Sequence, residues 1–107
     1  MNLLFVCDKN VMRSRTAEAI YNGSSQHRAK SAGVAHNSKV NVTPNLIHWA
    51  DIIFVMEEEH KEYLTREFPA DIGFREIIIL GIDDFYYYMD PELVTLIKDK
   101  VDPYLEQ

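Results

Sequence analysis

Residues 3–14 read LLFVCDKNVMRS, an apolar run followed by a polar loop and the start of a helical pattern. Leu3 to Val6 has the length and composition of a buried strand. From Ser14 to about Tyr21 the apolar residues recur at helical spacing. The loop between them therefore joins the end of a strand to the start of a helix. Backbone N–H groups at such a junction are free to bind an anion.

The rest of the chain repeats this alternation of short apolar runs with helical segments. Further strands are expected at residues 28–31, 51–56 and 76–80. Helices are expected from Thr43 onward, over 57–68, and from Asp90 to about Pro103. The pair Thr43-Pro44 is typical of an N-cap followed by the first helical residue, and Pro69 is expected to end the helix before it.

Near-continuous apolar strands separated by helices indicate a parallel sheet covered on both faces. We therefore expect residues 1–107 to form a single α/β domain with three layers, α/β/α. Its sheet should have four parallel strands, with a phosphate-binding loop after the first. In such folds the ligand lies at the carboxyl ends of the strands. The loops after Val6, Met56 and Leu80 should meet there.

Composition excludes several classes of function. The net charge of −6 argues against nucleic-acid binding, which needs a broad basic surface. No apolar run approaches the ~20 residues that cross a bilayer. The single cysteine rules out an intrachain disulfide and favours a cytoplasmic location. The four histidines lack metal-ligand spacing, so neither a metal nor another cofactor is expected.

Cys7 and Arg13 carry the chemistry of the first loop. Backbone N–H groups and a helix N-terminus stabilise a thiolate, and the same groups can cradle a phosphate. Five residues separate Cys7 from Arg13, so both side chains can face one anion. The planar guanidinium can bind two phosphoryl oxygens at once. A buried structural cysteine with an unrelated arginine is the alternative interpretation of the same pattern.

This loop resembles the active-site loop of the low-molecular-weight protein tyrosine phosphatases, C-x-x-N-x-x-R-S, through Cys7, Asn10, Arg13 and Ser14. Later segments resemble the family in the same order. They are Ser31-Ala32-Gly33, residues 50–56, His60 with Leu64, and the acidic tyrosine-containing loop before the last helix. The resemblance covers nearly the whole chain, in a short version typical of a bacterial branch of the family.

The resemblance implies a metal-free phosphatase that forms a phosphocysteine on Cys7, with Arg13 binding the phosphoryl oxygens. Asn10 would hold a left-handed backbone position and Ser14 would stabilise the thiolate or cap the helix. The substrate would be a phosphorylated protein, with phosphotyrosine expected, or a small aryl phosphate. The expected substrate-binding residues are Asp8, Lys9, Asn10, Val11, Met12 and Ser14, together with Tyr86 as an aromatic wall.

The general acid has three candidates. The family places an aspartic acid in the loop after the fourth strand, commonly before proline. Asp84 is our first choice and Asp83 the second, because both lie close to the end of that strand. Asp90 precedes Pro91 but has the position of a helix N-cap.

Three departures from the family pattern affect the loop, and one of them is Arg15 in place of the usual proline. Lys9 replaces the usual glycine, so its backbone should avoid positive φ. Met12 stands where many members have a second cysteine. An arsenate reductase, which shares this loop, normally needs further redox cysteines that this chain lacks. A non-catalytic phosphate-binding module is the other alternative.

Overall fold

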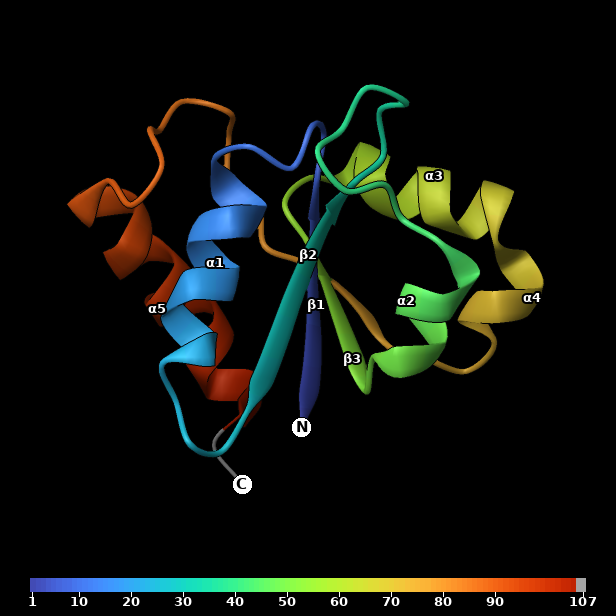
Figure 1. Ribbon diagram of the computed structural model, residues 1–107, viewed down its shortest axis with the longest axis horizontal. Helices are drawn as coiled ribbons and strands as arrows, with labels where there is room; N and C mark the ends of the chain where they lie inside the picture. Colours follow the sequence, from blue (N-terminus) through green and yellow to red (C-terminus); the bar gives the residue numbers. More distant parts are fainter. Residues whose placement is uncertain (106–107) are drawn as a thin grey trace.

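The computed structural model describes residues 1–105, which form four strands and five helices (Figure 1). The strands are β1 (Asn2–Cys7), β2 (Arg28–Gly33), β3 (Ile52–Val55) and β4 (Ile77–Ile79). The helices are α1 (Arg13–Asn22), α2 (Pro44–Trp49), α3 (Glu58–Glu67), α4 (Pro69–Ile72) and α5 (Pro91–Leu105).

All four strands are parallel and lie in the order β2-β1-β3-β4. β1 is therefore central, and its Val6 pairs with Ala32 on one side and Val55 on the other. Cys7 is the last residue of β1 and pairs with Gly33. The predicted four-stranded parallel sheet is confirmed, and the nucleophile candidate lies at the carboxyl end of its central strand.

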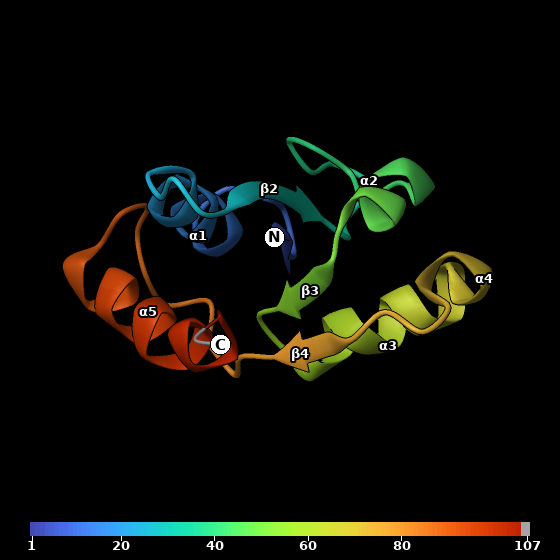
Figure 2. The same cartoon turned by 90° about the horizontal axis from the view of Figure 1, so that it is seen from below.

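The sheet separates two hydrophobic cores, because alternate residues of β1 point to opposite faces. Leu3, Phe5 and Cys7 pack with α1 and α5, through residues such as Ala17 and Ile97. Leu4 and Val6 pack on the other face with α2, α3 and α4, through residues such as Ile47, Leu64 and Ile72. Figure 2 shows α1 with α5 on one side of the sheet and α2, α3 and α4 on the other. The three-layer α/β/α prediction is confirmed.

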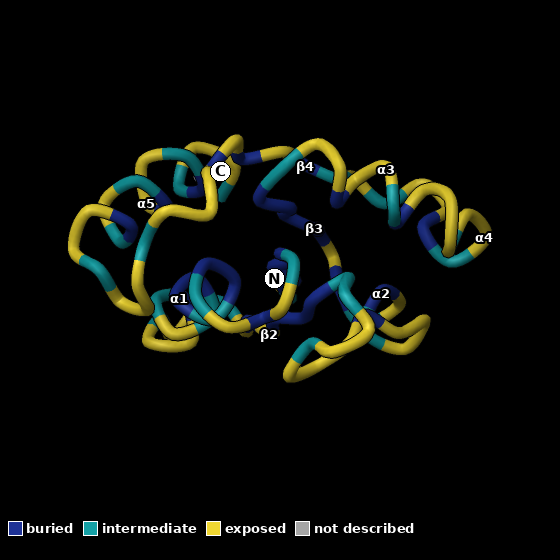
Figure 3. The backbone as a smooth tube through the Cα atoms, turned by 90° about the horizontal axis from the view of Figure 1, so that it is seen from above, coloured by how far each residue is buried: buried dark blue, intermediate teal, exposed yellow. Residues whose placement is uncertain are grey.

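The two central strands, β1 and β3, are buried on both faces of the sheet, as their apolar sequences required (Figure 3). Leu3, Leu4, Phe5 and Val6 are all fully buried. Removing each such side chain from water contributes about 1.5–3 kcal/mol. This packing makes β1 a rigid support for the loop that follows it.

Local capping explains most of the helix starts. The Leu46 N–H donates to Oγ1 of Thr43 at 3.2 Å, as expected at the start of α2. Glu57 caps α3, and its side chain and that of His60 form a capping box. The Glu92 N–H donates to Oδ1 of Asp90 at 2.9 Å. Asp90 is therefore the N-cap of α5.

Helix α3 ends at Glu67, before Pro69, as predicted. Pro69 also begins the short helix α4, which was not predicted. Helix α5 does not end at Pro103 and continues to Leu105. The reason is packing beyond the proline, because the Tyr104 ring lies edge-on to Phe54 and Leu105 packs against the core. Within residues 1–105 no helix has the length and apolar character needed to cross a membrane.

Candidate functional site

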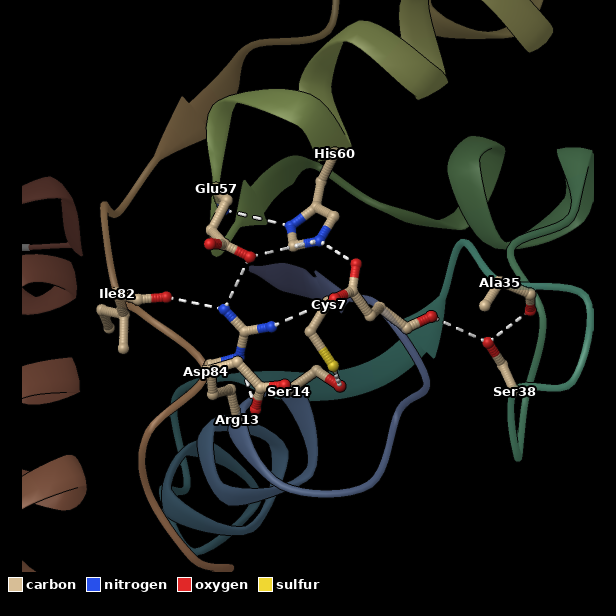
Figure 4. Close-up of polar contacts among 10 residues, drawn as sticks. Cys7, Arg13, Ser14, Ala35, Ser38, Glu57, His60, Ile82 and Asp84 are labelled. Atoms are coloured by element: carbon tan, nitrogen blue, oxygen red, sulfur yellow. Dashed lines mark hydrogen bonds and ion pairs between the residues drawn. The ribbon is translucent and has the colours of Figure 1, made fainter.

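Three loops meet at the carboxyl edge of the sheet, as expected for a parallel sheet. They follow β1, β3 and β4, and one side chain contacts all three. Arg13 leaves the β1 loop and reaches Glu57 after β3 and Ile82 after β4. Ile82 is itself anchored, because its N–H donates to the Met56 carbonyl at 2.9 Å. The candidate site is therefore assembled around Arg13 (Figure 4).

Cys7 lies at the bottom of this site. Its side chain is 3% exposed, and its Sγ lies 2.9 Å from Oγ of Ser14 in the first turn of α1. The Asn10 amide donates to the same Ser14 oxygen at 2.9 Å. Because Ser14 Oγ accepts that bond with a lone pair, its hydroxyl proton remains available to the sulfur. The contact places a hydroxyl donor where it would stabilise a thiolate.

Asn10 shapes the loop. Its φ of 58° lies in the left-handed region, as expected of an asparagine at this position. Its buried amide also donates to Oγ of Ser31 at 2.8 Å, and the Ser31 hydroxyl in turn donates to Glu18. Lys9 does not adopt a positive φ, so the loop accommodates a side chain at the position where glycine was expected.

The Gly33 backbone lies against the loop from the opposite side. A Cβ atom built on Gly33 would lie 2.6 Å from the Asp8 carbonyl oxygen and would also collide with Ser38. The same Asp8 carbonyl accepts hydrogen bonds from the Ala35 N–H and the Ser38 hydroxyl. The segment Ser31 to Gly33 therefore supports the loop in two ways, through a hydroxyl and through a close backbone approach.

The Arg13 guanidinium is 2% exposed and strongly oriented. Its Nη1 donates to the Ile82 carbonyl at 2.7 Å and to Oε2 of Glu57 at 3.0 Å. Nη2 lies 3.7 Å from Oδ2 of Asp8, and Nε lies 3.8 Å from Oδ1 of Asp84. Those two ion pairs are longer than hydrogen bonds. The Nε and Nη2 edge of the fork is thus the edge left for a phosphoryl group.

A cavity of about 290 Å³ opens over these groups. Its walls are the reactive thiol, the guanidinium and the loop residues between them, with one residue from the loop after β4: Cys7, Asp8, Lys9, Val11, Met12, Arg13 and Asp84. Among the described residues, the N–H groups of residues 9–12 donate to no protein acceptor. The loop can therefore offer several amides to one anion.

Most of the predicted site residues come together here. Asn10 and Ser14 lie directly behind the cavity wall and contact the residues that form it. Tyr86 does not line this cavity. Its ring packs edge-on against Phe85 and against the hydrophobic core, and it lines another hollow beside α5. The reason is that the loop turns Tyr86 inward to cover the core beneath it.

The acid candidates separate clearly in space. Asp84 lines the cavity and lies beside Nε of Arg13. Asp83 is exposed and is not a wall residue of that cavity. Asp90 lies at the start of α5, where its carboxylate accepts from the Glu92 N–H. Of the three, Asp84 alone lines the cavity together with Cys7 and Arg13.

Three contributors were not predicted as site residues. Glu57 is the N-cap residue of α3, and His60, which enters the sequence analysis only through the family resemblance, lies in the first turn of that helix. Ile82 contributes its backbone carbonyl. The sequence feature that could have indicated Glu57 and Ile82 is their position. Each closely follows a parallel strand, and the carboxyl ends of these strands lie at the same edge of the sheet as Cys7. No sequence pattern specified that Arg13 would join them.

Asp8, Glu57, Glu59 and His60 offer ligand atoms within 4.8 Å of one another. Oxygen and imidazole ligands of this kind suit a divalent cation in principle. However, the Asp8 and Glu57 carboxylates already face the Arg13 guanidinium. A metal ion here would have to compete with that fixed positive charge.

A larger cavity, of about 430 Å³, lies between α1 and α5. Tyr21, His27, Lys98 and Asp102 are among its lining residues. The Tyr21 hydroxyl donates to Oδ1 of Asp102 at 2.6 Å. Burial, reinforced by this carboxylate, raises the pKa of Tyr21 above its ordinary value of 10.0. The cavity lacks a thiol or a guanidinium, so it does not share the chemistry of the Cys7 site.

Comparison with known proteins agrees with this geometry. Residues 2–50 match the family model described as low molecular weight phosphotyrosine protein phosphatase. That segment contains β1, the Cys7 loop, α1 and β2. No protein with a curated function matches the chain.

Several solved structures share the fold. YwlE arginine phosphatase from Geobacillus stearothermophilus is 25% identical, with a TM-score of 0.72 over 97% of this chain and 92% of that one. Vibrio vulnificus Wzb in complex with benzylphosphonate is 22% identical, with a TM-score of 0.75 over 96% and 95%. The low molecular weight protein tyrosine phosphatase from T. tengcongensis is 24% identical, with a TM-score of 0.72 over 97% and 99%.

The matched segment carries the thiol and the guanidinium, and the remaining half supplies β3, β4 and α5 in the arrangement of the same fold. The sequence match thus covers residues 2–50, and the shared fold covers nearly the whole chain. The chain is therefore similar to the low-molecular-weight phosphotyrosine phosphatase family, in sequence over residues 2–50 and in fold along nearly its whole length.

Proposed function

We propose that this protein is a cysteine-dependent phosphatase that hydrolyses protein phosphotyrosine through a phosphocysteine intermediate. One observation carries the proposal. The Cys7 thiol, the Arg13 guanidinium and the Asp84 carboxyl line one cavity at the carboxyl end of the central strand. These are the nucleophile, the phosphate clamp and the acid that the reaction needs.

In the first step the Cys7 thiolate attacks phosphorus as the bond from phosphorus to the leaving oxygen breaks. Asp84, protonated at that moment, gives its proton to the leaving oxygen. In the second step the Asp84 carboxylate takes a proton from water, and the water oxygen attacks phosphorus. The S–P bond then breaks, so inorganic phosphate leaves and the thiolate is regenerated.

Arg13 and the loop amides bind the phosphoryl oxygens in both steps. Glu57 and the Ile82 carbonyl occupy Nη1, which fixes the plane of the guanidinium. The Nε and Nη2 edge can then form two parallel hydrogen bonds to phosphate. Because Asp84 lies beside Nε, the acid is close to where that phosphate would be held.

Phosphoarginine is a second candidate substrate. Its support is the 25% identity to YwlE from Geobacillus stearothermophilus, described as an arginine phosphatase. Both substrates present a phosphoryl group to the same nucleophile. They differ in the leaving atom, which is oxygen in phosphotyrosine and nitrogen in phosphoarginine. Two peptides with identical flanking residues, one with each phosphoamino acid, would distinguish them by kcat/KM.

The test of catalysis is hydrolysis of p-nitrophenyl phosphate by wild type, Cys7→Ser and Arg13→Lys. We expect no turnover for Cys7→Ser. Arg13→Lys keeps the charge but loses the fork, so we expect about a hundredfold loss of kcat/KM. Wild-type protein quenched in acid during turnover should contain phosphate on Cys7 by mass spectrometry. If wild type binds phosphate but shows no Cys7-dependent turnover, the protein is a phosphate-binding module instead.

A further inference from the structure

Asp8 places a carboxylate in the wall of the cavity, immediately after the nucleophile in the chain. Its side chain is 45% exposed, yet both of its oxygens are engaged. Oδ1 accepts from Nε2 of His60 at 2.7 Å, and Oδ2 lies 3.7 Å from Nη2 of Arg13. The carboxylate is therefore held at the cavity and is not free to swing away into solvent.

The partner that holds Asp8 is a neutral imidazole. His60 is fully buried, and the backbone N–H of Glu57 donates to its Nδ1 at 3.0 Å. A nitrogen that accepts a hydrogen bond carries no proton, so the ring proton lies on Nε2 and is donated to Asp8. The capping box of α3 thus fixes the tautomer. His60 orients the Asp8 carboxylate without cancelling its negative charge.

The charges around the cavity are unevenly distributed. Its floor has the Arg13 guanidinium, but the Glu57 carboxylate lies 3.0 Å from that group and partly neutralises its positive charge. The exposed part of the wall carries the carboxylates of Asp8 and Asp84, opposed there by Lys9. Asp84 is 65% exposed, so both carboxylates face the solution from which substrate arrives. A phosphorylated peptide would meet an acidic rim around a phosphate-binding floor.

We propose that Asp8 is a specificity-determining residue that selects phosphopeptides with a lysine or arginine beside the phosphorylated residue. This inference rests on the proposed phosphatase function. A substrate that adds only a phosphate dianion gains from Arg13 and the loop amides but is opposed by the rim. A substrate with a cation beside the phosphorylated residue is attracted by the rim instead of repelled. The cation pairs with Asp8 while the phosphate occupies the floor.

A neighbouring residue of the substrate is the group that can use this charge. Successive residues of an extended peptide lie about 3.3 Å apart. The long stems of lysine and arginine can bend back from such a position to a carboxylate at the rim. The preference should therefore lie next to the phosphorylated residue and fade at more distant positions.

The experiment uses three phosphotyrosine peptides that differ only in the residue after phosphotyrosine, which is arginine, glutamine or glutamate. For wild type at low salt we expect kcat/KM to fall in that order, with about a tenfold difference between the arginine and glutamate peptides. Asp8→Asn keeps an acceptor for His60 but removes the charge. In this variant we expect the kcat/KM of the arginine peptide to exceed that of the glutamate peptide by only about threefold or less.

Glu76→Gln is the matched control. Glu76 is an exposed acid just before β4, at the end of the sheet opposite the site, so it changes the net charge equally without changing the rim. The ratio of kcat/KM for the arginine peptide to that for the glutamate peptide should be the same in Glu76→Gln as in wild type. An unchanged ratio in Asp8→Asn, or a wild type that treats the three peptides alike, would overturn the inference.

Two further measurements separate the possible failures. Raising the salt concentration to about 0.5 M should remove most of the wild-type preference through screening, and this test needs no variant. Asp8→Ser replaces Asp8→Asn if the latter does not fold. Hydrolysis of p-nitrophenyl phosphate reports the proposed function alone. If that activity is present and the peptides are turned over equally, the specificity inference fails while the phosphatase function stands. If it is absent, both fail.

Discussion

The sulfur of Cys7 lies 2.9 Å from the hydroxyl oxygen of Ser14, and the same oxygen accepts a hydrogen bond from the Asn10 amide at 2.9 Å. The hydrogen bond between Cys7 and Ser14 joins the end of β1 to the first turn of α1. It is the contact through which the helix can act on the nucleophile.

Ser14→Ala should weaken Cys7 as a nucleophile, because a hydrogen bond to the attacking sulfur is lost. Such a bond contributes about 1.5–3 kcal/mol, so we expect at least a tenfold fall in kcat. The rate of Cys7 alkylation by iodoacetamide should fall as well. Ser25→Ala, an exposed serine after α1, is the control. Equal alkylation rates in Ser14→Ala and wild type would contradict the role assigned to Ser14.

Glu57→Gln should lower kcat about tenfold without raising KM. The variant keeps an acceptor for the capping box but weakens the charged hydrogen bond that orients Nη1 of Arg13. Removing a negative charge near the floor also favours binding of the phosphate dianion, which opposes any rise in KM. Steady-state kinetics with an aryl phosphate separate the two parameters. Glu62→Gln, exposed on the same helix, should match wild type, and a tenfold rise in KM for Glu57→Gln would refute this account.

Asp84→Asn should reduce kcat by about a hundredfold for phenyl phosphate and much less for p-nitrophenyl phosphate. The reason is that a poor leaving group needs the proton that Asp84 supplies, whereas p-nitrophenolate leaves without it. Asp83→Asn makes the same charge change one residue away and is the control. A larger fall in kcat for Asp83→Asn than for Asp84→Asn would contradict the assignment of Asp84 as the acid. An equal fall for both substrates in Asp84→Asn would contradict it as well.

Asp90→Ala should lower stability and leave the dependence on the leaving group unchanged. The Asp90 carboxylate caps α5 through the Glu92 N–H, so its loss should cost about 1 kcal/mol of unfolding free energy. Urea denaturation measures this loss. Asp90→Asn retains a capping side chain and should restore most of the stability. A leaving-group effect in either variant would mean that Asp90 takes part in proton transfer.

Tyr21→Phe should make stability less sensitive to alkaline pH. Burial and the Asp102 carboxylate raise the pKa of Tyr21 in the folded state above 10.0, the ordinary value that applies to the unfolded chain. Below pH 10 both states hold the proton, and the stabilising contribution is fully present. As pH rises above 10 the unfolded state alone loses the proton, so stability falls. Urea midpoints from pH 8 to about 11 should fall more steeply in wild type than in Tyr21→Phe. Parallel curves would show that another group controls alkaline unfolding.

The elements with local signals could be predicted from the sequence. The apolar runs of β1 and β3 indicated buried strands, and the caps at Thr43 and Asp90 marked helix starts that the structure confirms. Pro103 shows the limit of such signals. A proline favours ending a helix, but the packing of Tyr104 and Leu105 on the core outweighs it. That packing depends on residues distant in sequence, so no local pattern reveals it.

The candidate site also combines features that a local sequence segment indicates with contacts that depend on the tertiary fold. The Cys7 loop is one continuous segment, and its left-handed Asn10 was expected from the family resemblance, because asparagine tolerates that conformation. The partners of Arg13 could not, because Glu57 is 44 residues away in sequence and Ile82 is 69. Their distances to Arg13 depend on strand order and register. The same holds for the contact between His60 and Asp8, which requires α3 to lie directly over the loop.

Arg13 belongs to the first half of the chain, but Glu57, Ile82 and Asp84, which surround its guanidinium, all belong to the second. The reacting sulfur and the groups that steer the clamp are thus encoded in separate segments. Protein engineers could vary the side chains at positions 57 and 84 while keeping the first 50 residues constant, and every member of such a library would inherit the same thiol. Variation in turnover among its members would then report how an identical thiol responds to different electrostatic surroundings.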